Sequence, residues 1–175
     1  SHLIVIGAGP IGVELAQAHR RLGAEVTVLE MFKMMPKDDA EAVAVVRERI
    51  QAEGVDVREG VRIVGVANDG NGIAVTIEAD GKEMRLAGSH ILLAAGRRAN
   101  VSGLGLDLAG IKHDATGIKV DQRLRTTNKH VFAIGDVIGG YQFTHMAAYH
   151  AGVVIRNAVF NLRATVDDRA VPWVT

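Results

Sequence analysis

The chain has 175 residues, a length that suits one comfortable domain or two small ones. Its 20 Lys and Arg balance its 20 Asp and Glu, so net charge gives no electrostatic case for nucleic acid or an anionic membrane surface. It has no cysteine, which excludes disulfides and is compatible with a cytoplasmic location, and no segment resembles a signal peptide or a membrane-spanning helix of roughly 18 apolar residues.

The first residues predict a strand followed by a helix. Residues 3–6 form a continuous apolar run bounded by glycine, which is typical of a strand buried on both faces. Apolar residues then recur at spacings of four, three and four, and Gly23 ends the pattern. These spacings predict a helix whose inward face consists of Ile11, Leu15, Ala18 and Leu22.

The pattern of strand and helix repeats along residues 25–57. A second buried strand is predicted over residues 25–30, and a short third strand over residues 55–57. Between them Asp39 is placed to cap a helix that ends at Gly54. Its predicted inward face consists of Val43, Val46 and Ile50. Strands alternating with helices through short links indicate a right-handed parallel sheet.

Residues 62–89 change to short alternating runs separated by turns rich in Asn, Asp and Gly. This pattern predicts a three-stranded antiparallel β-meander. A further apolar run over residues 90–95 ends at Gly96 and predicts the next parallel strand. The meander is therefore expected in the crossover that leads to this strand.

The turn after the first strand reads Gly-Ala-Gly-Pro-Ile-Gly over residues 7–12. Gly7 allows the tight turn, Gly9 lets the backbone approach a pyrophosphate, and Gly12 lets the helix pack closely on the strand. Glu30 ends the next strand at about the spacing expected for an acid that binds ribose hydroxyls. The alternative is a glycine turn that binds nothing, with Glu30 merely solvated.

Glu30 also favours NAD over NADP. A carboxylate accepts hydrogen bonds from both ribose hydroxyls and repels a 2′-phosphate, whereas an NADP site calls for arginines. The residues after Glu30 are Met-Phe-Lys-Met, which offer one lysine and no arginine.

In residues 97–175, the apolar run 131–134 predicts another buried parallel-type strand, which leads into Gly135-Asp136. An acid at such a strand tip suits a polyhydroxyl or phosphate ligand, but Asp136 equally suits the capping of a turn. Thr144 is expected to cap a helix of about residues 145–162. Its inward positions are predicted as Met146, Val153 or Val154, and Val159.

The seven histidines do not predict a metal site. His145 and His150 lie five positions apart instead of the four that place two ligands on one helix face, and no third ligand is evident. A packing or solvent role is expected for both side chains.

Taken together, these segments resemble the FAD-dependent pyridine nucleotide–disulfide oxidoreductases, nearest to lipoamide dehydrogenases and mercuric-reductase-like enzymes. The resemblance covers nearly the whole chain, because the order and separation of the matching segments fit the family. The matching segments are residues 5–14, 94–100, 131–136, 143–148 and 171–175.

The resemblance implies two cofactors, NAD and FAD. The NAD pyrophosphate is expected at residues 7–12, including Pro10 and Ile11, with Glu30 on the adenosine ribose, Glu14 toward the nicotinamide, and Gly96 lining the same cleft. Ile63 is expected to touch adenine. On the FAD side, Asp136 is expected on the ribityl and phosphate groups. The backbone of Phe143, Thr144 and His145 is expected near the flavin ring, where the helix dipole stabilises a reduced, anionic flavin.

The same resemblance implies three parts: an NAD-binding domain over residues 1–96, the C-terminal portion of a split FAD-binding domain over 97–165, and the start of a dimerisation domain over 166–175. The family's own FAD glycine motif, redox cysteines and remaining dimer domain have no counterpart in the sequence. The remaining FAD and dimerisation domains of a homodimeric parent protein are thus the expected partners, and no catalytic residue is expected in this chain, which alone should be inactive. The competing hypothesis is a stand-alone dinucleotide-binding sensor or regulatory module.

Overall fold

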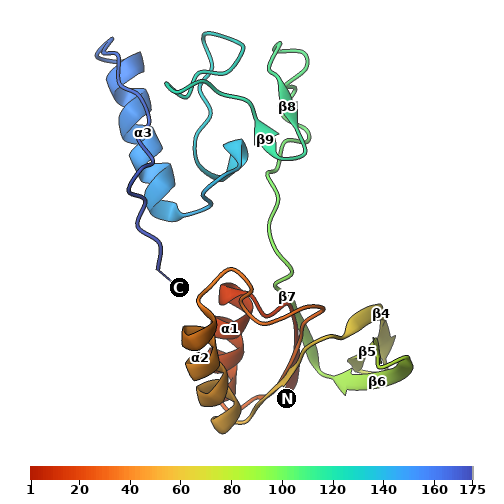
Figure 1. Ribbon diagram of the computed structural model, residues 1–175. Helices are drawn as coiled ribbons and strands as arrows, with labels where there is room; N and C mark the ends of the chain where they lie inside the picture. Colours follow the sequence, from red (N-terminus) through yellow and green to blue (C-terminus); the bar gives the residue numbers. More distant parts are fainter. Residues whose placement is uncertain (175) are drawn as a thin grey trace. The chain divides into compact units, whose positions relative to one another are not determined.

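The computed structural model describes residues 1–174, so Thr175, the last residue of the predicted dimerisation segment, lies outside the described residues. The chain forms two compact units, residues 1–96 (unit 1) and 97–174 (unit 2). Figure 1 shows the elements of each.

Unit 1 is built on a four-stranded parallel sheet in the order β3-β2-β1-β7. The strands are β1 (His2–Ile6), β2 (Glu25–Leu29), β3 (Val55–Arg58) and β7 (His90–Leu93). The two central strands carry buried apolar residues on both faces, as the continuous apolar runs predict. The predicted α/β class and parallel sheet are therefore confirmed. The strand predicted over residues 90–95 ends earlier, at Leu93.

The two faces of this sheet are covered by different layers (Figure 1). Helices α1 (Pro10–Arg21) and α2 (Ala40–Ala52) cover one face, where Leu3 and Val5 of β1 lie in their core cluster. Ile4, which points the other way, packs with Val75 and Ile77 of the meander in a second cluster. Alternate side chains of one strand thus fill two separate cores.

Helix α2 follows its sequence prediction closely. The Asp39 carboxylate accepts hydrogen bonds from the backbone N–H groups of Glu41 and Ala42, at 3.0 and 3.2 Å. Val43 and Ile50 are buried against the sheet. The N-cap and inward face predicted for this helix are confirmed.

The inward face predicted for α1 is wrong. Ile11 is 47% exposed and Leu22 is 84% exposed, whereas Gly12, Val13 and Ala16 are buried. Both rows of residues have helical spacing, and the structure selects the row with the smaller side chains. Glycine and alanine bring the helix axis close to the sheet, a preference that apolar spacing alone does not reveal.

The antiparallel meander consists of β4 (Arg62–Asp69), β5 (Gly72–Ala79) and β6 (Lys82–Gly88). It precedes β7 in the chain, so the predicted meander and its place in the crossover are confirmed. The register of β4 on β5 shifts between Ile63 and Gly65. This bulge keeps Ile63 on the buried side of the meander.

Unit 2 has little sheet. A two-stranded ladder of β8 (His113–Asp114) and β9 (Gly117–Ile118) precedes the 3₁₀ turn η1 (Gly135–Ile138) and helix α3 (Thr144–Ala158). Its core gathers Leu106, Ile111, Ile118 and Ala133. Residues 166–174 belong to the same compact unit as residues 97–165.

Three sequence predictions for unit 2 are wrong. Residues 131–134 form no strand in the described chain, and their one sheet-like contact is an isolated antiparallel bridge from Phe132 to Arg125. A strand requires a ladder partner along its length, and the described part of unit 2 supplies none here. Helix α3 ends at Ala158 instead of residue 162, and Val159 is 70% exposed.

The third error concerns the start of α3. Phe143, in extended conformation, is the N-cap, and Thr144 is the first helical residue, with no side chain capping the helix. The Phe143 carbonyl accepts from the N–H groups of Met146 and Ala147, so the helix begins one residue before the prediction. Within the described residues, no helix is both long and apolar enough to span a membrane.

Candidate nucleotide-binding site

The glycine turn lies at the carboxyl edge of the parallel sheet in unit 1. Gly7 donates its N–H to the Leu29 carbonyl at 2.8 Å and has a positive φ of 104°. A Cβ at Gly7 would lie 2.6 Å from the Ala94 carbonyl oxygen. Only glycine combines this dihedral angle with this closeness to the backbone that follows β7.

Gly12 and Gly9 meet opposite surroundings. A Cβ at Gly12 would lie 2.0 Å from the Gly7 carbonyl oxygen, so the first turn of α1 packs directly on the loop. A Cβ at Gly9 would meet no atom within 4 Å. Gly12 is therefore required by packing, whereas Gly9 keeps space clear beside the helix end.

The N-terminus of α1 has the features of an anion site. Gly9 is its N-cap, Pro10 follows as the first helical residue, and no side chain caps the helix or places an acid in its first turn. The N–H groups of Ile11 and Gly12 have no acceptor within the helix, because they belong to its first turn. With the clear space at Gly9 and the positive end of the helix dipole, this arrangement fits a pyrophosphate.

Glu30 is tied to the same loop. One carboxylate oxygen accepts from the Ala8 N–H at 2.8 Å, and the other accepts from the Phe32 N–H at 3.0 Å. Glu30 is only partly buried, so its carboxylate is not fully withdrawn from solvent. The structure thus brings the glycine turn and the acid at the end of β2 together, as ribose and pyrophosphate recognition by one nucleotide requires.

The other residues predicted for this site are Glu14, Gly96 and Ile63. Glu14 is exposed on α1, and Gly96 follows β7 with a positive φ of 103°. Ile63 packs against the core that contains Leu29, the residue before Glu30. The contacts proposed for them with nicotinamide and adenine stay predictions.

The second candidate site lies in unit 2. Asp136 is exposed in the first turn of η1 and forms an ion pair with Arg97, at 3.3 Å. The same guanidinium donates to the Gln142 carbonyl at 2.7 Å. Arg97 therefore links the Gly135-Asp136 turn to the segment that leads into α3.

His150 of α3 holds this turn by a hydrogen bond. Gly135 has a positive φ of 68° and donates its N–H to His150 Nδ1 at 3.3 Å. Burial lowers the pKa of the His150 imidazole, which favours the neutral ring that can accept this bond. A Cβ at Gly135 would lie 3.0 Å from the Ala147 side chain, so the turn packs tightly on α3.

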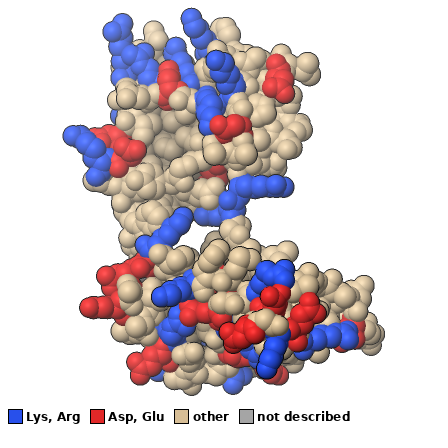
Figure 2. All heavy atoms as spheres, turned by 45° about the vertical axis from the view of Figure 1, so that its right-hand side comes forward, with Lys and Arg blue, Asp and Glu red and all other residues tan. Residues whose placement is uncertain are grey.

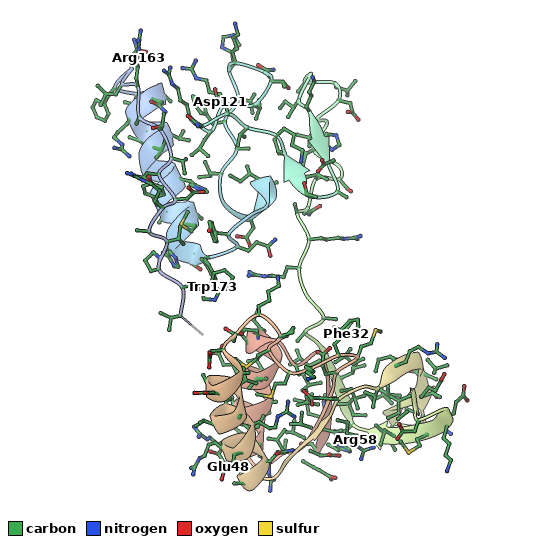
Figure 3. All side chains as sticks on the ribbon, in the orientation of Figure 1. Phe32, Glu48, Arg58, Asp121, Arg163 and Trp173 are labelled. Carbon is green, nitrogen blue, oxygen red and sulfur yellow. The ribbon has the colours of Figure 1, made fainter. Side chains whose placement is uncertain are left out.

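The residues predicted to approach flavin lie at the start of α3. The Phe143 and His145 rings stack with centroids 5.2 Å apart, and the Trp173 ring meets Phe143 edge-on at 5.0 Å. Figure 3 labels Trp173. Thr144 and His145 are exposed, and their N–H groups lie in an uncapped first turn. Such a helix end fits an electron-rich carbonyl or anion.

Sequence reasoning missed two side chains that shape these sites. Glu59 accepts from the Met34 N–H beyond β2, and His150 accepts from Gly135. Each partner is far away in sequence, so no local pattern announces the contact. Among the described residues, no group of three or more His, Cys, Asp or Glu side chains is placed to hold a metal ion.

Charged side chains of both signs lie on the protein surface (Figure 2). On the face shown in Figure 2, basic and acidic side chains are interspersed, in keeping with the zero net charge.

A glycine turn opening an uncapped helix, an acid at the end of the next strand and a meander crossover define a dinucleotide-binding module of the Rossmann type. Residues 1–151 match the family model described as pyridine nucleotide-disulphide oxidoreductase. The chain belongs to this family, whose members use FAD and NAD(P)H.

The relatives confirm the resemblance seen in the sequence. A mercuric reductase from Streptomyces lividans is 35% identical over 175 residues, and a dihydrolipoyl dehydrogenase from Thermus scotoductus is 40% identical over 160 residues. The matches cover 99% and 89% of this chain but 37% and 35% of those proteins. The chain therefore spans little more than a third of their length.

Solved structures give the same result. The flavoprotein disulfide reductase RclA from Escherichia coli matches 96% of this chain and 38% of its own, with a TM-score of 0.86 and 29% identity. LpdA from Mycobacterium tuberculosis matches 97% of this chain and 37% of its own, with a TM-score of 0.84 and 32% identity.

Proposed function

We propose that unit 1 binds NAD(H) through the glycine turn of residues 7–12 and Glu30. The observation that carries this proposal is the hydrogen bond from the Ala8 N–H to the Glu30 carboxylate, which joins the pyrophosphate loop to the ribose acid. The uncapped helix end and the clear space at Gly9 support it. In this arrangement the N–H groups of Ile11 and Gly12 hold phosphate oxygens.

The same geometry favours NAD over NADP. Both oxygens of Glu30 already accept backbone N–H groups, which holds the carboxylate at the end of β2. A 2′-phosphate placed there would meet this negative charge, whereas ribose hydroxyls donate to it. Lys33 is the one basic residue in the four positions after Glu30, and a single lysine does not offset the repulsion.

Unit 2 is proposed to supply part of an FAD site. Asp136 would accept from ribityl hydroxyls at the tip of its turn, and the first-turn N–H groups of α3 would meet the flavin ring. Arg97 and His150 support the proposal by holding that turn from two sides. When bound, FAD supplies the hydride and electron chemistry, while these residues bind and orient.

For the parent protein we propose hydride transfer between NAD(H) and FAD, and onward to or from a redox disulfide, as in a dihydrolipoamide dehydrogenase-like enzyme. The named relatives are oxidoreductases, which supports this class. Because the chain spans only 37% and 35% of these two relatives, we propose that residues 1–175 alone do not turn over. A homodimeric parent, a cytoplasmic location and the assignment of 97–165 and 166–175 to split FAD and dimerisation domains stay predictions.

The test is a titration of the purified chain with NADH and with NADPH, followed by nicotinamide fluorescence and calorimetry. We expect NADH to bind with 1:1 stoichiometry and at least about tenfold more tightly than NADPH, since a hydrogen-bonded charge is worth about 1.5–3 kcal/mol. Glu30→Gln should weaken NADH binding and reduce the difference in affinity between NADH and NADPH. Glu25→Gln, at the opposite end of the same strand, is the matched control.

A clear preference for NADPH would contradict the role of Glu30. No binding of either nucleotide by a folded chain would contradict the assignment of unit 1. Tight stoichiometric binding of FAD by the chain alone would show that the flavin site is complete here, contrary to the proposed split.

A further inference from the structure

The loop that follows Glu30 is held by side chains from outside it. The Met34 N–H donates to Oε1 of Glu59, which follows β3, at 2.5 Å. The Arg47 guanidinium of α2 donates to the same oxygen, also at 2.5 Å. Three elements of unit 1 thus meet at one carboxylate.

This contact is only two residues from the Phe32 N–H that orients Glu30. Phe32 donates to Glu30 Oε1 at 3.0 Å, and its carbonyl accepts from the Gly60 N–H, next to Glu59, at 3.3 Å. Figure 3 labels Phe32 on this loop. Contacts with Glu59 and with the neighbouring Gly60 backbone therefore hold the chain close to the Phe32 N–H.

The Arg47–Glu59 pair has the burial and charge to act as such an anchor. The two side chains are 29% and 26% exposed, so the pair is partly withdrawn from solvent screening. The hydrogen bond from Arg47, together with that from the Met34 N–H, lowers the pKa of the Glu59 carboxyl, so both contacts favour its charged form.

The loop itself needs an anchor. Met34 and Met35 are buried against the helices, and Met35 adopts a positive φ of 47°, which is costly for a residue other than glycine. The Met35 N–H also donates to the Ala8 carbonyl at 3.0 Å, in the glycine turn. A strained loop that contacts both the turn and Glu30 persists only when its surroundings fix it.

We propose that Glu59, fixed by Arg47, is a positioning residue for the nucleotide site: it sets the orientation of Glu30 through the Met34–Phe32 segment and so controls affinity for the adenosine ribose without touching it. This inference rests on the proposed binding of NAD(H). A purely structural Glu59 would stabilise unit 1 without acting through Glu30, and the two roles make different predictions.

A double-mutant cycle on the full chain separates them. NADH dissociation constants are measured for the wild type, Glu59→Ala, Glu30→Gln and the double variant. Glu59→Ala should weaken binding about fivefold or more in the wild-type background and less than about twofold in the Glu30→Gln background, because its effect passes through Glu30. Equal losses in both backgrounds would overturn the inference.

Two further variants serve as controls. Glu59→Gln keeps an oxygen that accepts from Met34 but loses the charge, so it should recover part of the lost affinity. Glu48→Ala removes an exposed carboxylate from the same helix as Arg47 and should leave NADH affinity unchanged (Figure 3). Circular dichroism and thermal melting show whether each variant is folded, and Glu59→Gln replaces Glu59→Ala in the cycle if the latter does not fold.

A readout without nucleotide completes the test. Hydrogen exchange of the Phe32 amide should be at least about tenfold faster in Glu59→Ala than in the wild type, since its bond to Glu30 loses its support. If the wild type binds NADH and Glu59→Ala binds it with the same affinity, this inference is overturned while the proposed function stands. A wild type that binds no NADH would overturn the proposed function and, with it, this inference.

Discussion

Two glycines three positions apart should respond in opposite ways to alanine. At Gly12 the new Cβ would lie 2.0 Å from the Gly7 carbonyl oxygen, about 1.4 Å short of an ordinary contact. Both sides of this contact are backbone, so α1 must move off the loop. Such overpacking costs about 1–3 kcal/mol, and Gly12→Ala should lower the urea midpoint of unit 1 accordingly.

At Gly9 the same change meets no atom within 4 Å, and its φ of −72° and ψ of 176° suit alanine. Alanine is a poorer N-cap than glycine by about 0.5–1 kcal/mol. It also restricts the unfolded chain, which returns about 0.4–1 kcal/mol. The urea midpoint of Gly9→Ala should therefore stay close to that of the wild type.

NADH binding should separate the two variants again. The methyl group of Gly9→Ala would occupy the space proposed for the pyrophosphate, and the loss of one or two charge-assisted hydrogen bonds weakens binding about 10- to 100-fold. A Gly12→Ala variant with the urea midpoint of the wild type would contradict the close packing of α1 on the loop. A Gly9→Ala variant that binds NADH as tightly as the wild type would contradict a pyrophosphate beside Gly9.

Two further changes test the charges and hydrogen bonds of the scaffold. Glu53 accepts from Arg21 and Arg49, with Arg21 the larger cause, and its pKa falls from 4.5 to about 2. The ionised Glu53 carboxylate therefore stabilises the fold fully above pH 4.5, and this stabilisation is lost as the pH falls toward 2. Between these pH values the melting temperature of Glu53→Gln should fall less steeply than that of the wild type. Parallel plots of melting temperature against pH for the two proteins would contradict this role of Glu53. His150→Leu leaves the buried Gly135 N–H without its acceptor, which should cost about 1–3 kcal/mol in urea unfolding, while His150→Gln should cost less; equal costs would contradict the contact.

The features that sequence predicted well are local. Asp39 caps α2 because the accepting oxygen and the donating N–H groups lie within three residues. The glycine turn and Glu30 were predicted because each follows a buried strand, and the carboxyl ends of parallel strands share one edge of the sheet. Local spacing and strand order were therefore sufficient to predict most of the elements of unit 1.

The features that sequence missed depend on distant neighbours. Ile11 and Leu22 have helical spacing, but the sheet packs against the smaller row of Gly12 and Ala16. Residues 131–134 have the apolar composition of a strand but find no ladder partner within the described unit. An apolar composition shows that a segment can be buried, but the partner it packs against depends on the tertiary structure.

Polar residues inside helices and after strands were the hardest to interpret. His150 was expected to have a packing or solvent role, yet its imidazole holds the turn that presents Asp136. Buried Asn157 exchanges hydrogen bonds with the backbone of Ala164, seven residues on. Such side chains gain their role from one backbone group brought near by tertiary structure, and no periodicity marks them.

The central claim is that the nucleotide binds at the N-terminus of α1 beside Glu30. Backbone amide chemical shifts of the ¹⁵N-labelled chain, recorded during titration with NADH, test it most directly. The claim predicts that the amides of Ala8, Ile11, Gly12 and Phe32 shift together along one saturable curve. Saturating NADH that shifts other amides and leaves these four unchanged would contradict it.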